Sequence, residues 1–140
     1  MTNPGLQPTE IRYDGVHCNL RIQQWTPGVV VLRISGSDVG EFGDAPMVEL
    51  NHRFAGAEPI ELFVDARDVQ GASIEVSGAW AQWLGANKLR LQHISMLTGS
   101  RYIQITADFV RRFADLQGVM RIYTDPAAFD AALAQSLKQS

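Results

Sequence analysis

The sequence predicts an α/β fold, in which one mixed β-sheet opens with an antiparallel hairpin and is covered by about four helices. Three observations support this prediction. Two β-type segments near the start are separated only by the turn Thr26-Pro27-Gly28. After them, segments with helical spacing alternate with short apolar segments. The chain has 140 residues, 46% of them hydrophobic, which is enough for a single domain with its own core.

The hairpin is predicted from residues 17–25 and 29–34. In the first segment Cys18, Leu20 and Ile22 alternate with polar residues, as in a half-buried strand, and the second is a β-branched run. Residues 1–12 include two prolines and a glycine, so we expect a flexible leader outside the core. The predicted domain therefore covers residues 13–140.

The sequence pattern in the middle of the chain predicts a helix, a strand and a second helix. Residues 45–55 have helical spacing, with Pro46 in the first turn and Gly56 after the last turn. Residues 60–66 form a short apolar segment that predicts a strand. A longer helix is expected to begin at Ser77 or Gly78 and to continue through Leu91.

The last third repeats the alternation. Residues 94–97 predict a buried strand, and Thr106 is placed where a helix would have its N-cap, with Gly118 ending that helix. Residues 119–123 predict a strand, and Asp125-Pro126 predicts the start of a final helix. Strand-helix-strand order favours parallel pairing through right-handed crossovers, so the later strands should form the centre of the sheet.

Composition argues against several classes of protein. A net charge of −3 is opposite to the basic excess of nucleic-acid-binding modules, so we expect no nucleic-acid partner. The single cysteine cannot form an internal disulfide, and the N-terminus has neither the basic nor the apolar region of a signal peptide. No apolar run approaches the ~20 residues of a transmembrane helix. We therefore expect a cytoplasmic protein without a transmembrane segment.

The sequence offers little for catalysis. His17, His52 and His93 are far apart, and neither a His-x-x-x-His pair nor a cysteine cluster provides a local metal site. The glycine-containing segment 36–40 lacks the Gly-Lys-Ser/Thr ending of a phosphate-binding loop. We therefore predict a protein that is not an enzyme and that uses no cofactor or metal.

The candidate binding region is the stretch from Glu61 to Trp80, where an apolar strand runs into a polar turn and then a helix. Backbone N–H groups and the helix dipole converge at such a junction, so small α/β domains often bind there. The candidate partner- or ligand-binding residues are Asp65, Asp68, Gly71, Ser73, Ser77, Gly78, Trp80 and Trp83.

The element order, with its opening hairpin and closing helix, resembles the STAS domain, the fold of the anti-sigma-factor antagonists. The resemblance spans most of the chain from His17 onward. It is clearest in the strand of residues 61–66 that contains Asp65, in ISMLTGSRY at residues 94–102 and in RIYTDPAAFDAAL at residues 121–133. The glycine, serine and tryptophan found after the loop in SpoIIAA-like proteins are matched by Gly71, Ser73 and Trp80.

The resemblance implies a noncatalytic regulatory module of bacterial signal transduction. Such a module would dock onto a kinase-like or signalling protein through the loop after Asp65 and the helix beginning near Ser77. Ser77-Gly78 matches the family's phosphorylated pair, so phosphorylation of Ser77 is expected to end partner binding. A phosphate at a helix start would be held by backbone N–H groups and would add charge to the docking surface. The alternative is that Ser77 only caps the helix.

Trp80 and Trp83 lie three residues apart and share a predicted helix face. They could line an apolar pocket, which gives the alternative function of a SpoIIAA-like carrier or sensor for a lipid-like or other small ligand. The second interpretation is that both are core residues. A homodimer is left open as the oligomeric state.

Overall fold

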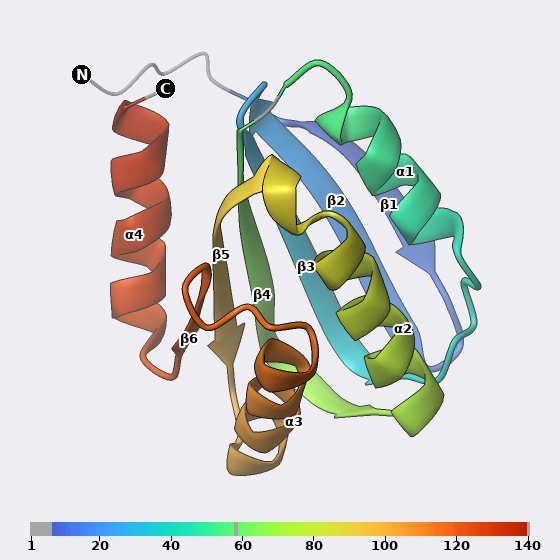
Figure 1. Ribbon diagram of the computed structural model, residues 1–140. Helices are drawn as coiled ribbons and strands as arrows, with labels where there is room; N and C mark the ends of the chain where they lie inside the picture. The colour runs from blue at the N-terminus through green and yellow to red at the C-terminus, as the bar shows by residue number, and fades with distance from the viewer. Residues whose placement is uncertain (1–6, 58, 140) are drawn as a thin grey trace.

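The computed structural model describes residues 7–57 and 59–139, and there it forms one six-stranded sheet with four α-helices (Figure 1). The strands are β1 (Thr9–Asp14), β2 (Cys18–Thr26), β3 (Val29–Asp38), β4 (Ile60–Ala72), β5 (Leu91–Thr98) and β6 (Met120–Tyr123). The helices are α1 (Ala45–Phe54), α2 (Ile74–Ala86), α3 (Arg101–Phe113) and α4 (Pro126–Lys138), with a 3₁₀ turn at Lys88–Arg90.

The spatial order of the strands is the same as their order in the sequence. β1, β2 and β3 pair antiparallel, whereas β3, β4, β5 and β6 pair parallel. Each parallel step needs a crossover, and α1, α2 and α3 supply the three crossovers. The predicted mixed sheet with an antiparallel start and parallel later strands is confirmed, but the later strands do not all lie at its predicted centre, because β6 is an edge strand.

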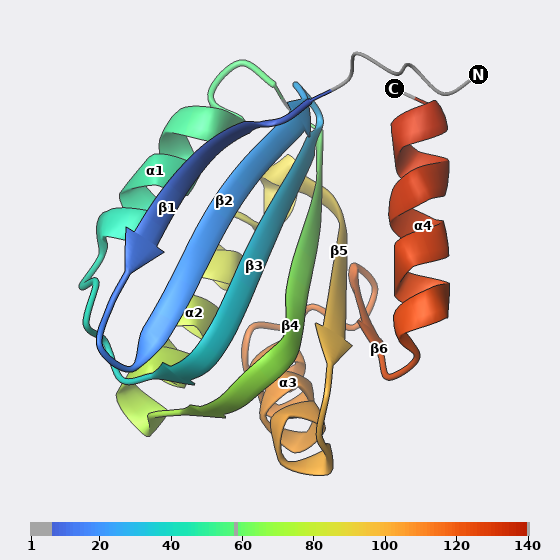
Figure 2. The ribbon, with the colours of Figure 1, turned by 180° about the vertical axis from the view of Figure 1, so that it is seen from behind.

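The helices cover the two faces of the sheet unequally. α1, α2 and α3 lie on one face, and in the view from behind the strands stand in front of them (Figures 1 and 2). α4 packs on the opposite face near β4, β5 and β6. Alternation along β3 shows this division, because Val30 and Leu32 join the cluster under α1 to α3 whereas Val29 and Val31 pack with Phe129 of α4.

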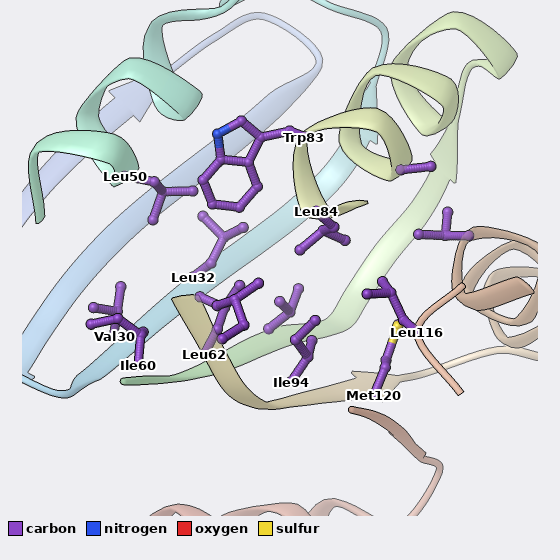
Figure 3. Close-up of a cluster of buried hydrophobic side chains, with 14 of the residues drawn as sticks. Val30, Leu32, Leu50, Ile60, Leu62, Trp83, Leu84, Ile94, Leu116 and Met120 are labelled. Carbon is purple, nitrogen blue, oxygen red and sulfur yellow. The ribbon is translucent and has the colours of Figure 1, made fainter. Parts of the chain in front are cut away.

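The larger core lies between the sheet and α1, α2 and α3. Figure 3 shows Leu50 of α1 and Trp83 of α2 above Leu32 of the sheet, with Leu116 and Met120 at the other end of the cluster. Apolar side chains of this size contribute roughly 1.5–3 kcal/mol each when fully buried. This cluster therefore fixes the positions of α2 and α3, the helices that border the candidate site.

The predicted leader is wrong at its C-terminal end. Residues 9–14 form β1 and pair with β2 in the register Thr9↔Gln24 to Asp14↔Asn19. Ile11 and Tyr13 alternate with polar residues and pack against the larger core, which explains why an edge strand forms here. Residues 1–6 of the predicted leader lie outside the described residues.

Two predicted helix starts are also wrong. α2 begins after Ser73, whose Oγ accepts the N–H of Val76 at 3.2 Å, and not at Ser77. α3 begins after Ser100, whose Oγ accepts the N–H of Ile103 at 3.2 Å, and not at Thr106. In both cases the real start is an earlier serine that satisfies a free N–H group of the first turn.

The predicted extent of the second helix is wrong as well. α2 ends at Ala86, and Leu91 is the first residue of β5. Leu89 lies in the 3₁₀ turn, where its side chain is fully exposed. Leu89 and Leu91 are spaced from Trp80 and Trp83 as they would be in a helix, but they lie outside α2.

Candidate functional site

The segment after Asp65 is strand and not the predicted loop. β4 continues to Ala72, and its pairing with β3 includes Ser35↔Asp68 and Ser37↔Gly71. Two register shifts interrupt this pairing, one between Arg33 and Ser35 and one between Gly36 and Ser37. β4 therefore carries Asp68 and Gly71 past the core on a long, bent extension of the sheet.

The junction from β4 to α2 is tied to the end of β3. The N–H of Ser73 donates to the carbonyl of Asp38 at 3.0 Å, and the Asp38 carboxylate accepts the N–H of Gly40 at 3.1 Å. Asp38 itself is buried. The bond from Ser73 to Asp38 anchors the start of α2 at the C-terminal end of β3, a central strand of the sheet.

Ser77 lies one turn inside α2. Its N–H already donates to the carbonyl of Ser73 at 2.9 Å, so it is not a free group of the helix start. Ser77 is half-buried, and it lines a cavity together with Trp80. The N-cap role belongs to Ser73, whereas phosphorylation of Ser77 stays a prediction.

That cavity lies between the sheet and helices α2 and α3. It has a volume of about 100 Å³, and its lining is almost entirely apolar. Its walls include Val76 and Trp80 of α2 and Ile103 and Val110 of α3, above Leu62 of the sheet. Pockets for drug-sized ligands are typically ~300–1,000 Å³, so the volume does not favour the predicted lipid-like cargo.

The two tryptophans have different surroundings. Trp83 is buried, its Nε1 donates to Asn51 Oδ1 at 3.2 Å, and it belongs to the larger core. Trp80 is half-buried, lines the cavity and meets Trp83 edge-to-face with ring centroids 6.0 Å apart. The structure thus places Trp80, but not Trp83, at the cavity.

The outer side of α3 carries exposed apolar side chains that sequence reasoning did not single out. We call these residues the α3 stripe: Tyr102, Ile105, Phe109 and Phe113, which are 61%, 61%, 54% and 65% exposed. Phe109 and Phe113 stack with ring centroids 5.7 Å apart. Their spacing of i, i+3, i+7 and i+11 places them on one side of the helix, next to the side that carries the buried Ile103 and Val110. This spacing is the sequence pattern from which a second apolar side of the helix could have been predicted.

The α3 stripe borders the cavity. Thr106 lines the cavity. Because each residue of an α-helix is rotated by about 100° from the one before, Tyr102, Phe109 and Phe113 are the neighbours of Thr106 on the helix surface. α2 and α3 stand side by side on the same face of the sheet (Figure 1), and their side chains together enclose the cavity. An apolar surface therefore runs from the cavity onto the exposed side of α3.

Asp65 faces the other side of the sheet. It is buried, and its carboxylate accepts hydrogen bonds from Arg33 Nη1 at 2.6 Å and Arg67 Nε at 3.0 Å. Arg67 also contacts Asp130 of α4 at 2.8 Å, and hydrogen bonding to Asp65 raises the pKa of the Arg67 guanidinium. Asp68 is exposed on the same face. The predicted site residues are thus divided between two faces, with Asp65 and Asp68 on one and Ser77 and Trp80 on the other.

Within the described residues, no group of three or more histidine, cysteine, aspartate and glutamate side chains could hold a metal ion. No α-helix in the same part of the chain is long and apolar enough to cross a membrane.

The sheet order, the antiparallel start and the placement of the helices define a SpoIIAA-like, or STAS, fold. A similar solved structure is that of an uncharacterized protein from the DUF3478 family with a SpoIIAA-like fold from Shewanella loihica PV-4. The TM-score is 0.63 at 12% identity, covering 86% of this chain and 98% of that chain. The unphosphorylated anti-sigma factor antagonist SpoIIAA matches with a TM-score of 0.48 at 16% identity, covering 82% and 96%. The similarity to the DUF3478 protein confirms the predicted fold.

Comparison with protein-family models gives no match for this chain, and comparison with curated proteins gives none either.

Proposed function

We propose that this protein is a noncatalytic regulatory module that binds a signalling protein through the α2–α3 surface, meaning the first turn of α2 together with the α3 stripe. The observation that carries the proposal is the exposed stack of Phe109 and Phe113. Contiguous exposed apolar side chains on a soluble domain mark interaction sites more often than isolated ones do. The STAS-like fold supports the same class of function.

The partner of this surface would present an apolar segment of its own. Aromatic side chains that become buried in an interface each contribute roughly 1.5–3 kcal/mol from apolar burial alone. The α3 stripe provides two phenylalanines, a tyrosine and an isoleucine within three helical turns. Ile74, which is 88% exposed in the first turn of α2, extends the apolar surface toward the start of that helix.

Ser77 would act as the switch of this surface. It lies at the cavity edge between α2 and α3, so a phosphate there would put nearly two negative charges beside apolar groups. Desolvating that charge would oppose docking of an apolar partner. This reason replaces capture by free N–H groups, because the N–H of Ser77 is already bonded to Ser73.

The proposal can be tested by photo-cross-linking in the cells from which the chain derives. A photoreactive amino acid at position 109 should cross-link to one discrete protein, whereas the same group at Gln135, exposed on α4, should not. The cross-linked protein is then purified and its affinity for the wild type is compared with that for a Phe109→Ser/Phe113→Ser variant. Loss of affinity without loss of thermal stability is the expected result.

Three outcomes would contradict the proposal. Equal cross-linking from positions 109 and 135 would mean that the contact is nonspecific. Cross-links only between copies of this chain would assign the α3 stripe to a homodimer. A copurifying apolar molecule in native mass spectrometry, displaced by Trp80→Ala, would instead support the carrier function.

The switch is tested separately with the purified partner. Ser77→Asp should weaken binding, whereas the control Glu75→Gln, an exposed position in the same turn, should not. Unchanged binding of Ser77→Asp would remove Ser77 from the mechanism and would leave the docking surface itself in place.

A further inference from the structure

The uncovered face of the sheet places arginines from three neighbouring strands side by side. Arg12 of β1 lies opposite Arg21 of β2, and Arg21 lies opposite Arg33 of β3. Ile11 and Leu20, their chain neighbours, point into the larger core, so alternation directs the arginines to the opposite face. Figure 2 shows that none of the helices formed by the described residues lies over β1, β2 and β3 on this face.

Such a row has an electrostatic cost, because like charges directly opposite each other destabilise a sheet. Arg33 is balanced by Asp65 at 2.6 Å. Arg12 and Arg21 instead share the single carboxylate of Glu10, at the long distances of 3.8 and 3.9 Å. Their side chains are 62% and 42% exposed, so both guanidiniums keep donors available to a bound anion.

The next row along the strands has the opposite character. Asp14, Asn19, Ser35 and Asp68 lie opposite one another across β1, β2, β3 and β4. Within residues 7–57 and 59–139, no ion pair involves Asp14 or Asp68. Two residues of strand separate the two rows, or roughly 7 Å. The face thus offers cationic donors beside carboxylate and amide acceptors.

Both rows line one hollow of about 710 Å³. Arg67 and Asp130 close its side toward α4 and are joined by their 2.8 Å ion pair. Asp65 holds Arg33 and Arg67 at its floor, so part of the site is fixed before any ligand binds. This volume lies within the ~300–1,000 Å³ range of small-molecule sites, unlike the apolar cavity on the other face.

We propose that this hollow binds a small zwitterionic molecule that carries a phosphate or carboxylate group and an ammonium group. The anion is held by the guanidiniums of Arg12 and Arg21, where bidentate charge-assisted bonds favour planar recognition. The ammonium group is held by Asp14, which lies on β1 two residues from Arg12 and lines the same hollow. The inference is independent of the proposed protein docking, because the two surfaces lie on opposite faces of the sheet.

The test is a titration of the full chain, followed by backbone and arginine Nε–H NMR signals and by calorimetry. The probes are O-phosphoethanolamine and γ-aminobutyrate, with inorganic phosphate and ethanolamine as single-charge controls. We expect saturable shifts centred on Arg12 and Arg21 for at least one zwitterion, with weaker binding of both controls. Comparison of the two zwitterions shows whether the site prefers phosphate or carboxylate.

Variants locate the binding energy. Arg12→Gln/Arg21→Gln should weaken the preferred zwitterion by about tenfold or more, the loss expected for one or two charge-assisted hydrogen bonds. Arg101→Gln, an exposed arginine on α3, should leave the affinity unchanged. Asp14→Asn should reduce the affinity for the zwitterion toward that for the anion alone.

A second readout is thermal unfolding. The preferred zwitterion should raise the midpoint of thermal unfolding of the wild type more than that of the arginine double variant, because the variant binds it more weakly. Absence of saturable shifts at millimolar probe, or equal weakening by Arg101→Gln, would overturn the proposal.

Discussion

Arg33 and Asp65 lie opposite each other on the parallel strands β3 and β4, with 2.6 Å between Arg33 Nη1 and Asp65 Oδ2. The other carboxylate oxygen of Asp65 accepts the Nε–H of Arg67 at 3.0 Å and the Arg67 backbone N–H at 3.2 Å. A buried carboxylate is therefore satisfied by two guanidiniums and one peptide group. Asp65 holds β3, β4 and, through Arg67, α4 in one polar network.

Replacing Asp65 with alanine should lower the free energy of unfolding by about 2 kcal/mol. Breaking a fully buried ion pair costs roughly 3–5 kcal/mol, and the cost is smaller here because Arg33 and Arg67 keep 25% and 32% side-chain exposure. Urea unfolding at neutral pH measures the change. Asp68→Asn is the matched control: Asp68 is exposed on the same strand, so its change should stay within ~0.5 kcal/mol. Equal effects of the two variants would contradict this role of Asp65.

Replacing Ser73 with alanine should lower the free energy of unfolding by about 1 kcal/mol, because the N–H of Val76 loses its acceptor. Ser77→Ala should cost less, since Ser77 caps no N–H group and alanine favours the helix interior. The difference between the two variants in urea unfolding identifies the N-cap. A larger loss for Ser77→Ala would place the helix start where the sequence suggested it.

Local sequence patterns were sufficient to predict an element when the signals that define it lie within its own residues. The hairpin of β2 and β3, helix α1 and the Asp125-Pro126 start of α4 were predicted because alternation, a turn and a proline are all local signals. β1 was missed because only Ile11 and Tyr13 carry its alternation. Its stability comes from pairing with β2, which a sequence window does not contain.

The candidate site depended more on distant contacts. Ser73 and Ser77 are both plausible caps locally, and the bond from Ser73 to Asp38 selects the first. β4 continues beyond Ala66 because it pairs with β3, and this extension sends Asp65 and Ser77 to opposite faces. Proximity in sequence therefore suggested one site where the structure has two surfaces.

Replacing Gly99 with alanine should destabilise the protein by about 2 kcal/mol or more. A Cβ atom at Gly99 would overlap the carbonyl oxygen of Arg67, so the β5–α3 turn or β4 must shift. The shift would also strain the contacts of Arg67 with Asp65 and Asp130. Thermal unfolding should show a clear decrease for Gly99→Ala. The matched control is Gly118→Ala, where no atom of the described residues lies within 4 Å of the added Cβ, and comparable losses in both variants would contradict the close approach.

The thiol of Cys18 should make stability depend on pH in the alkaline range. Burial, followed by the charges of Asp38 and Glu41, raises its pKa to about 11 from the ordinary thiol value of 9.0. Between these values the unfolded chain loses the thiol proton while the folded chain keeps it, so the free energy of unfolding falls as pH rises, by up to about 1.4 kcal/mol per pH unit. Between pH 8 and pH about 11, the free energy of unfolding should therefore fall less in Cys18→Ala than in the wild type. The comparison is between the two decreases, so it does not depend on the stability of the variant at pH 8. Urea unfolding across that range measures how the free energy of unfolding of each protein changes with pH. Tyr13, whose pKa is also raised, contributes equally to both slopes. Parallel slopes would show that the buried thiol does not carry the alkaline dependence.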